Sequence, residues 1–102
     1  MTEYVLPRLV DDTTAIQAFR NAYYRLTGKP AFRVKRVLLS NYLGNEVNTK
    51  AAVFTLQELD TVVNMFEAYS RKRTKHLSQD FEYERGYKIL KNLLRILNEK
   101  EA

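Results

Sequence analysis

The chain of 102 residues contains no cysteine, a single histidine, three glycines and two prolines. Without cysteine the chain can form neither a disulfide nor a thiolate metal site, and the sequence does not indicate an oxidising or a reducing compartment. A zinc site draws on several histidine or cysteine ligands. The chain has no cysteine and no second histidine that could join His76 in such a site. We therefore expect no metal, and we expect His76 to lie on the surface.

Motifs of catalysis are missing as well. The three glycines form no glycine-rich phosphate loop, and no serine stands in the surroundings of a nucleophile. Asp80 and Glu84 share one helical face, but acidic residues in a first turn also stabilise the N-terminus of a helix. Glu84 can in addition pair with Lys88 on the next turn. We predict a non-enzymatic protein that needs no cofactor.

The sequence also has no long apolar run. No stretch approaches the ~18 residues of a membrane span, and the N-terminus lacks the basic start and apolar segment of a signal peptide. A chain of this length buries roughly 60–68% of its unfolded surface, so one core can form unaided. We expect one soluble domain over residues 1–102, located in the cytoplasm. Small, motif-poor chains of this kind often belong to viruses or phages, which would make that the cytoplasm of a host cell.

Positive charge is the clearest bias that the sequence does have. Seventeen Lys and Arg residues against twelve Asp and Glu residues give a net charge of +5, and such an excess favours an acidic partner, most often nucleic acid. The densest basic run follows Tyr69, and a second group surrounds Lys35. We predict that phosphate is contacted by Arg33, Lys35, Arg36, Arg71, Lys72, Arg73 and Lys75. The alternative is that these cations face water and complement the ends of helices, by ~0.3–1 kcal/mol each.

The clearest structural signal covers residues 54–69. Thr55 and Glu58 have the spacing of a capping box, in which each side chain accepts a hydrogen bond from the backbone amide of the other residue. Phe54 and Leu59 flank the box as a hydrophobic staple does. Apolar residues then follow at helical spacing, so we predict a helix that ends near Arg73.

Two further helices are predicted around this one. The first runs from caps at Asp11–Thr13 to about Leu26, ended by Gly28 and Pro30, and Tyr24 falls on its exposed side. The second begins after Ser78 and continues to Leu97, with a loose tail over residues 98–102. Its apolar arc is wide, which makes this helix either central in the fold or one half of a homodimer contact.

Residues 31–43 fit two patterns. Phe32-Arg33-Val34-Lys35 alternates as a strand does, whereas Val34, Leu38 and Tyr42 have the spacing of one helical face. An internal repeat decides for the helix, because residues 2–46 and 49–97 can be read as two copies of a strand-helix-helix unit. We therefore predict a mainly α fold of about four helices with one or two short strands. Residues 45–50 are expected to form a polar connection, and 51–54 a short extended segment.

A strand followed by two helices over residues 3–43 resembles the ribbon-helix-helix DNA-binding proteins. The residues that carry the resemblance are Val5-Leu6-Pro7 at the end of the strand, Gly28 between the helices, and Arg36 to Leu43 in the second helix. The resemblance implies that two copies pair their strands into a ribbon that enters the major groove of DNA, and that the N-termini of the second helices hold phosphates. The sequence departs from the family at Pro30-Ala31-Phe32-Arg33, where a Ser/Thr-x-Ser-Glu start is usual. Its strand also lacks the polar row that would read bases.

The second function that the sequence supports is binding of a protein or peptide, as an adaptor or as a subunit of a larger assembly. A groove between the two halves, or the wide apolar face of the last helix, would serve as the contact. The side chains that we expect to take part are Tyr24, Tyr69, Tyr87, Leu90 and Leu94, since aromatic rings often anchor a peptide or stack on bases.

Overall fold

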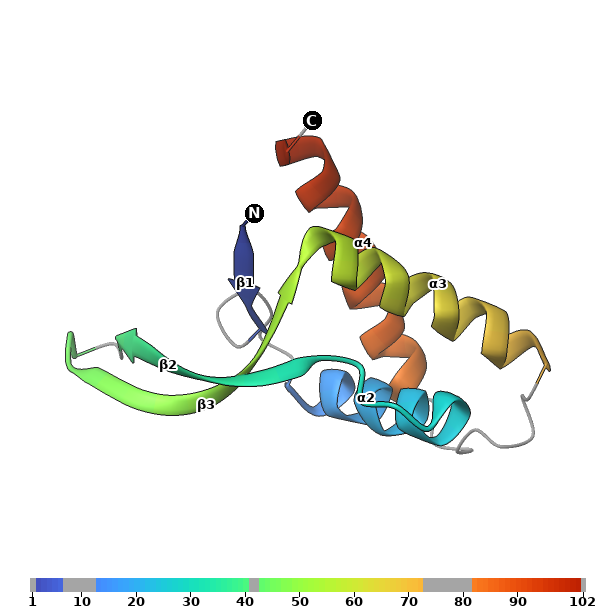
Figure 1. Cartoon of the computed structure of the whole chain (residues 1–102), viewed down its shortest axis with the longest axis horizontal. Coiled ribbons are helices and arrows are strands. Elements are labelled where there is room, and N and C mark those ends of the chain that lie inside the picture. Colours follow the sequence, from blue (N-terminus) through green and yellow to red (C-terminus); the bar gives the residue numbers. More distant parts are fainter. Residues whose placement is uncertain (1, 7–12, 41–42, 73–81, 102) are drawn as a thin grey trace.

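The computed structural model describes residues 2–6, 13–40, 43–72 and 82–101. In chain order the elements are β1 (Glu3–Val5), α2 (Thr13–Thr27), β2 (Arg33–Ser40), β3 (Glu46–Thr55), α3 (Leu56–Lys72) and α4 (Glu82–Glu101). The strands form one antiparallel sheet in the order β1-β3-β2. The three helices gather at one end of the sheet, and the β2–β3 hairpin extends away from them (Figure 1).

The capping box at the start of α3 is confirmed. The Thr55 hydroxyl accepts a hydrogen bond from the Glu58 amide, and the Glu58 carboxylate accepts one from the Thr55 amide, both at 3.2 Å. Phe54 and Leu59 on either side are fully buried, as a hydrophobic staple requires. Since β3 ends at Thr55 and α3 begins at Leu56, the strand passes into the helix without a loop.

Helix α2 ends as its sequence predicts. Gly28 has a φ of 74°, a left-handed conformation that glycine adopts without steric cost. Its amide donates to the Tyr24 carbonyl at 2.8 Å, which satisfies one of the open carbonyls of the last turn. The Thr27 hydroxyl donates to the Tyr23 carbonyl at 2.9 Å. The predicted caps Asp11 and Asp12 lie outside the described residues.

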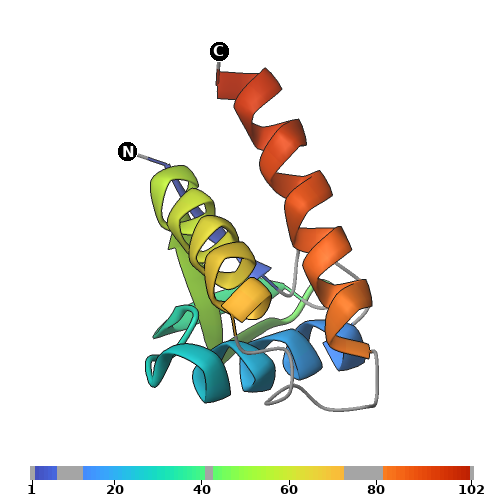
Figure 2. The ribbon, with the colours of Figure 1, turned by 90° about the vertical axis from the view of Figure 1, so that its right-hand side faces the viewer.

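Helix α4 packs mainly on α2, and Gly86 makes this contact close. A Cβ at Gly86 would overlap the carbonyl oxygen of Ala15 and lie 2.8 Å from the Cβ of Phe19. The close approach of the α2 and α4 backbones therefore explains why a glycine occupies position 86 inside α4. Figure 2 shows the result, with α3 and α4 standing side by side above α2.

One core joins the helices to the sheet. Paired residues of an antiparallel sheet share a face, so Phe54 and Ala52 of β3 lie on the face that meets the helices, together with Phe32 just before β2. The apolar residues predicted for the inner side of α2 are buried, as are most of those predicted for α3 and α4. Only partly covered are Tyr69, Tyr83, Tyr87 and Ile89, and Ile96 is exposed. The core is completed by Leu6, Ile16, Phe19, Ala22, Tyr23, Leu26, Leu59, Val62, Val63, Phe66, Leu90, Leu93, Leu94 and Leu97.

The far part of the hairpin has no such support. We call residues 36–40 and 46–50, which pair with each other as the ends of β2 and β3, the ribbon. β1 pairs only with residues 53–55 of β3, so both edges of the ribbon are open among the described residues. It projects by about 14 Å, at 3.4 Å per residue, and it lies along the longest dimension of the molecule, which measures 45 Å (Figure 1).

The predicted fold class is therefore wrong. The described residues form three helices and a three-stranded antiparallel sheet, where about four helices and one or two short strands were expected. Residues 33–40 are a strand and not a helix, and 46–50 begin β3 and do not form a connection. Residues 98–101 continue α4 where a loose tail was expected.

The expected repeat of a strand-helix-helix unit does not describe the elements either. The first half contains strand, helix and strand, whereas the second contains strand, helix and helix. Within residues 31–43, where the ribbon-helix-helix resemblance implies the second helix, residues 33–40 likewise form β2.

Candidate functional site

The ribbon carries a pair of cations that no acidic side chain neutralises within the described part of the chain. Arg36 of β2 is directly opposite Lys50 of β3, and both residues are exposed. Like charges on paired residues repel each other, so this pair does not stabilise the hairpin. The same face continues outward with Leu38, which is paired with Asn48. Along this side of the projecting element a basic pair is thus followed by the pair of Leu38 and Asn48 and then, at the outer end, by Ser40 paired with Glu46.

The neighbouring cations Arg33 and Lys35 lie on the opposite face of the sheet and are already paired. The Arg33 guanidinium donates to both carboxylate oxygens of Glu58, at 2.7 and 2.8 Å, and to Glu3 at 3.0 Å. The Lys35 ammonium donates to the other oxygen of Glu3 at 3.1 Å. These ion pairs tie β2 to β1 and to the start of α3, so two of the predicted phosphate contacts serve the fold.

The pKa values of the two carboxyl groups reflect this network. Hydrogen bonds from Arg33, followed by those from the Thr55 side of the capping box, lower the pKa of Glu58 to about 2 from its ordinary 4.5. Hydrogen bonds from Lys35 and then Arg33 lower the pKa of Glu3. Both carboxylates therefore stay charged throughout the neutral range.

Apolar side chains are exposed around the same hairpin. Of the six large hydrophobic residues that are exposed in the described part of the chain, four belong to the hairpin and its turn: Val34 at 58%, Leu38 at 58%, Leu43 at 67% and Val47 at 46%. Val34 and Leu38 share one face of the sheet, whereas Val47, paired with Leu39, lies on the other. Contiguous exposed apolar groups mark contact surfaces more often than isolated ones do. The ribbon is thus basic in part and apolar in part.

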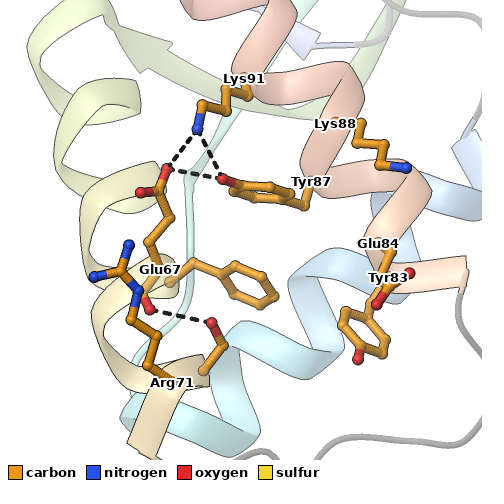
Figure 3. Close-up of a pocket in the computed structure, with 9 residues that line it drawn as sticks. Glu67, Arg71, Tyr83, Glu84, Tyr87, Lys88 and Lys91 are labelled. Atoms are coloured by element: carbon orange, nitrogen blue, oxygen red, sulfur yellow. Dashed lines mark hydrogen bonds and ion pairs between the residues drawn. The ribbon is translucent and has the colours of Figure 1, made fainter.

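The other candidate site is a hollow between α3 and α4, with a volume of about 500 Å³ (Figure 3). Its aromatic wall consists of Phe66, Tyr83 and Tyr87, whose rings lie 5.4–6.2 Å apart around Phe66. The remaining lining residues are Glu67, Ser70, Arg71, Glu84, Lys88 and Lys91. This volume and aromatic wall are typical of pockets for small molecules.

The polar groups at one end of this hollow satisfy one another. The Tyr87 hydroxyl donates to Glu67 at 2.8 Å, and the Lys91 ammonium lies 3.1 Å from that hydroxyl and 3.3 Å from the same Glu67 oxygen. The hydrogen bond from Tyr87, with those from Lys91, lowers the pKa of Glu67. The pKa of Lys91 is raised by its bonds to Tyr87 and Glu67. The arrangement fastens α4 to α3 and occupies the polar groups at this end of the hollow, so we regard the ribbon as the stronger site.

The residues predicted to contact a protein partner fall into three environments. Tyr24 is 58% exposed on α2, as predicted, whereas Tyr69 packs partly against the core. Tyr87 is part of the fastening between α3 and α4. Leu90 and Leu94 are 0% and 9% exposed. The apolar face of α4 is thus occupied by the chain's own core.

The basic run after Tyr69 is only partly described. Arg71 is exposed on the last turn of α3 and borders the hollow, and Lys72 is the final residue of that helix. Arg73, Lys75 and His76 lie outside the described residues. Phosphate contacts by this group stay a prediction.

Lys50 and Asn48 were not among the site residues predicted from the sequence. Both fall in a stretch that was expected to be a polar connection, and their relation to Arg36 and Leu38 depends on the register of the hairpin. The signal that could have identified them is Gly44 between two β-prone runs, because a connection of three to five residues that contains a glycine indicates a hairpin. Gly44 has the positive φ, 83°, that such turns need.

No group of three or more His, Asp or Glu residues suited to a metal ion occurs in the ranges that the structure describes. Within the same ranges, none of the helices combines the length and the apolar character that crossing a bilayer demands. Comparison of the chain with protein-family models, with curated proteins and with solved structures finds no match.

Proposed function

We propose that this protein binds nucleic acid and that the ribbon is its contact with a DNA duplex. The observation that carries the proposal is the directly paired Arg36 and Lys50 on an element that stands clear of the helices. The major groove of B-DNA is about 12 Å wide and admits a two-stranded ribbon. The pair would then meet phosphates at the edge of the groove, where cations supply most of the affinity.

The outer part of the same face has groups that suit base edges. An amide such as that of Asn48 can bond to adenine, and an apolar group such as Leu38 can contact a thymine methyl. Lys35 and Arg33 support this contact indirectly, because their ion pairs with Glu3 and Glu58 fix the root of the hairpin. The net charge of +5 adds to the attraction at longer range.

Titration of a labelled random-sequence duplex at several salt concentrations tests the proposal. We expect affinity to fall steeply with salt, and the double variant Arg36→Glu, Lys50→Glu to abolish binding. The milder variant Arg36→Gln, Lys50→Gln should lower the slope of log K against log salt by about 2, since two phosphate contacts are lost.

The matched control is Arg25→Glu with Lys29→Glu, which changes the net charge by the same amount. Both residues are exposed at the end of α2, at the opposite end of the molecule from the ribbon (Figure 1). We expect this control to keep most of the affinity. Equal losses in both double variants would assign binding to total charge and remove the ribbon from the proposal. Binding that does not respond to salt would rule out phosphate contacts altogether.

A protein partner is the second candidate, favoured by the exposed apolar side chains of the hairpin. A contact of this kind would depend on Leu38, Leu43 and Val47 and would be insensitive to salt. The duplex titration separates the two functions. If the wild-type protein does not bind the duplex at low salt, binding of a protein through the exposed apolar side chains of the hairpin becomes the favoured function.

A further inference from the structure

We propose that two copies of this chain form a homodimer by pairing their β2 strands edge to edge. The proposal does not rest on nucleic-acid binding, and because the paired ribbons form a four-stranded element, the dimer would separate before one two-stranded ribbon entered the major groove. It starts from the open edge of β2, which pairs with β3 on one side only and has no partner on the other side in the described part of the chain. Open edges are templates for further strand pairing.

The surroundings of this edge favour a partner. A two-stranded hairpin without a third strand or a covering helix is at best marginally stable in water. The ribbon has neither, and its β2 strand leaves Val34 and Leu38 each 58% exposed. Pairing with another strand would supply the missing neighbour and cover both side chains.

The charge pattern of β2 selects the second copy and one register. In an antiparallel pair with a two-fold axis normal to the sheet, one residue must face its own copy. Two registers pair seven residues of Arg33–Ser40, and they are centred on Arg36 and on Val37. Centring on Arg36 brings two guanidinium groups together, and like charges on opposed residues are destabilising.

The register centred on Val37 avoids every such conflict. Val37 faces Val37 of the second copy, Arg36 faces Leu38, and Lys35 faces Leu39. The remaining pair, Val34 and Ser40, is uncharged. Lys35 and Arg36 therefore meet apolar side chains, over which the stems of Lys and Arg can pack, and Arg33 lies beyond the seven paired residues.

The dimer would be a six-stranded sheet with a helical body at each end. Each face of one ribbon would continue into the same face of the other, because the axis is normal to the sheet. The Arg36 and Lys50 pairs of both copies would lie on one face. Val37 and Leu39 of both copies would lie on the other.

Cysteine trapping tests this register directly, because the chain has no cysteine of its own. Residues facing each other in an antiparallel pair have Cα atoms about 4.5–5.5 Å apart, within the range of a disulfide. We expect full-length Val37→Cys to form a covalent dimer on mild oxidation. The control is Thr49→Cys, which is directly paired with Val37 on β3 and lies on the same face. Its copy would be three strand spacings away, about 14 Å, and out of reach.

Sedimentation of the wild-type chain over a range of concentrations completes the test. We expect a dimer, which Val37→Lys dissociates by placing two ammonium groups at the axis, whereas Thr49→Lys leaves it in place. A wild-type chain that is monomeric throughout, or equal cross-linking of the two cysteine variants, would overturn the proposal. Circular dichroism of each variant ensures that a folded chain is being compared.

Discussion

Residues 46–50 and 51–54 belong to one strand, β3, but their environments are opposite. Every residue from Ala51 to Phe54 is buried, whereas residues 46–48 and Lys50 are exposed and Thr49 is partly so. The change occurs where the helices end, because β1 and the helical body support only the second part of the strand. Strand geometry is thus maintained by the hairpin alone on one side of Ala51 and by a core on the other. The two regions should respond differently to the same kind of substitution.

Truncation of an apolar side chain should show the largest difference. We expect Phe54→Ala to lower the free energy of unfolding by about 3–5 kcal/mol, because it removes a fully buried ring from between the helices and the sheet. Leu38→Ala should change it by no more than about 0.5 kcal/mol, because Leu38 is already exposed to water. Urea unfolding at low protein concentration, where chains are separate, measures both.

If Phe54→Ala does not fold, Phe54→Leu serves in its place, with an expected loss of about 1 kcal/mol. Equal losses for positions 54 and 38 would show that the ribbon is as firmly supported as the body, contrary to the comparison above.

Gly86→Ala should give the next largest effect, and it is confined to the body. Alanine favours a helix over glycine by about 1 kcal/mol, but its methyl group would overlap the Ala15 carbonyl and force α2 and α4 apart. We expect a net loss of about 1–3 kcal/mol in the free energy of unfolding. A gain in stability would mean that the helices have room to separate at no cost. Ala68→Gly, at an exposed position of α3, is the control for helix propensity alone.

Glu58→Gln is expected to have the smallest effect on the free energy of unfolding and to change how that free energy depends on pH. The pKa of Glu58 is about 2 in the folded chain, against an ordinary 4.5. The folded state therefore gains stability from this carboxylate above about pH 4.5, and it loses that gain as the pH falls toward 2. Because the side chain is 38% exposed, we expect the variant to lose at most about 1 kcal/mol at neutral pH.

The pH dependence distinguishes this loss from a general weakening. Wild type and Glu58→Gln should differ at pH 7 and converge near pH 2 in thermal unfolding. A constant difference across that range would show that the carboxylate charge is not the cause.

The same contrast between the helical body and the ribbon explains which elements could be predicted from the sequence. The capping box at Thr55 and the inner faces of α2 and α3 were predicted because one side of each element is buried, and burial imposes a period on the residues. Neither face of residues 36–40 is buried, since Arg36, Leu38 and Ser40 are exposed and Val37 and Leu39 are only partly covered, so no strict alternation of polar and apolar residues is imposed on them. The apparent repeat then supplied a helix by analogy, against the alternation at Phe32–Lys35 that indicated a strand.

The site was predicted in part for a related reason. Arg36 was identified by its type and by the charge around it. Its partner Lys50 is fourteen positions away, and only the pairing of β2 with β3 brings the two together. The ion pairs that occupy Arg33 and Lys35 likewise depend on Glu3 and Glu58, from two other elements. Long-range pairing of this kind is not written in local sequence patterns.

The direct passage from β3 into α3 has a consequence for how the chain can change in length. Inserting one residue between Ala51 and Leu59 would reverse the two faces of the strand or turn the helix by about 100°, since no loop takes up the change. Either outcome would expel Phe54 or Leu59 from the core. Insertions at the turn near Gly44, which faces open space, disturb neither element. Homologous chains of different length should therefore differ at the tip of the hairpin and keep the spacing from Ala51 to Leu59 unchanged.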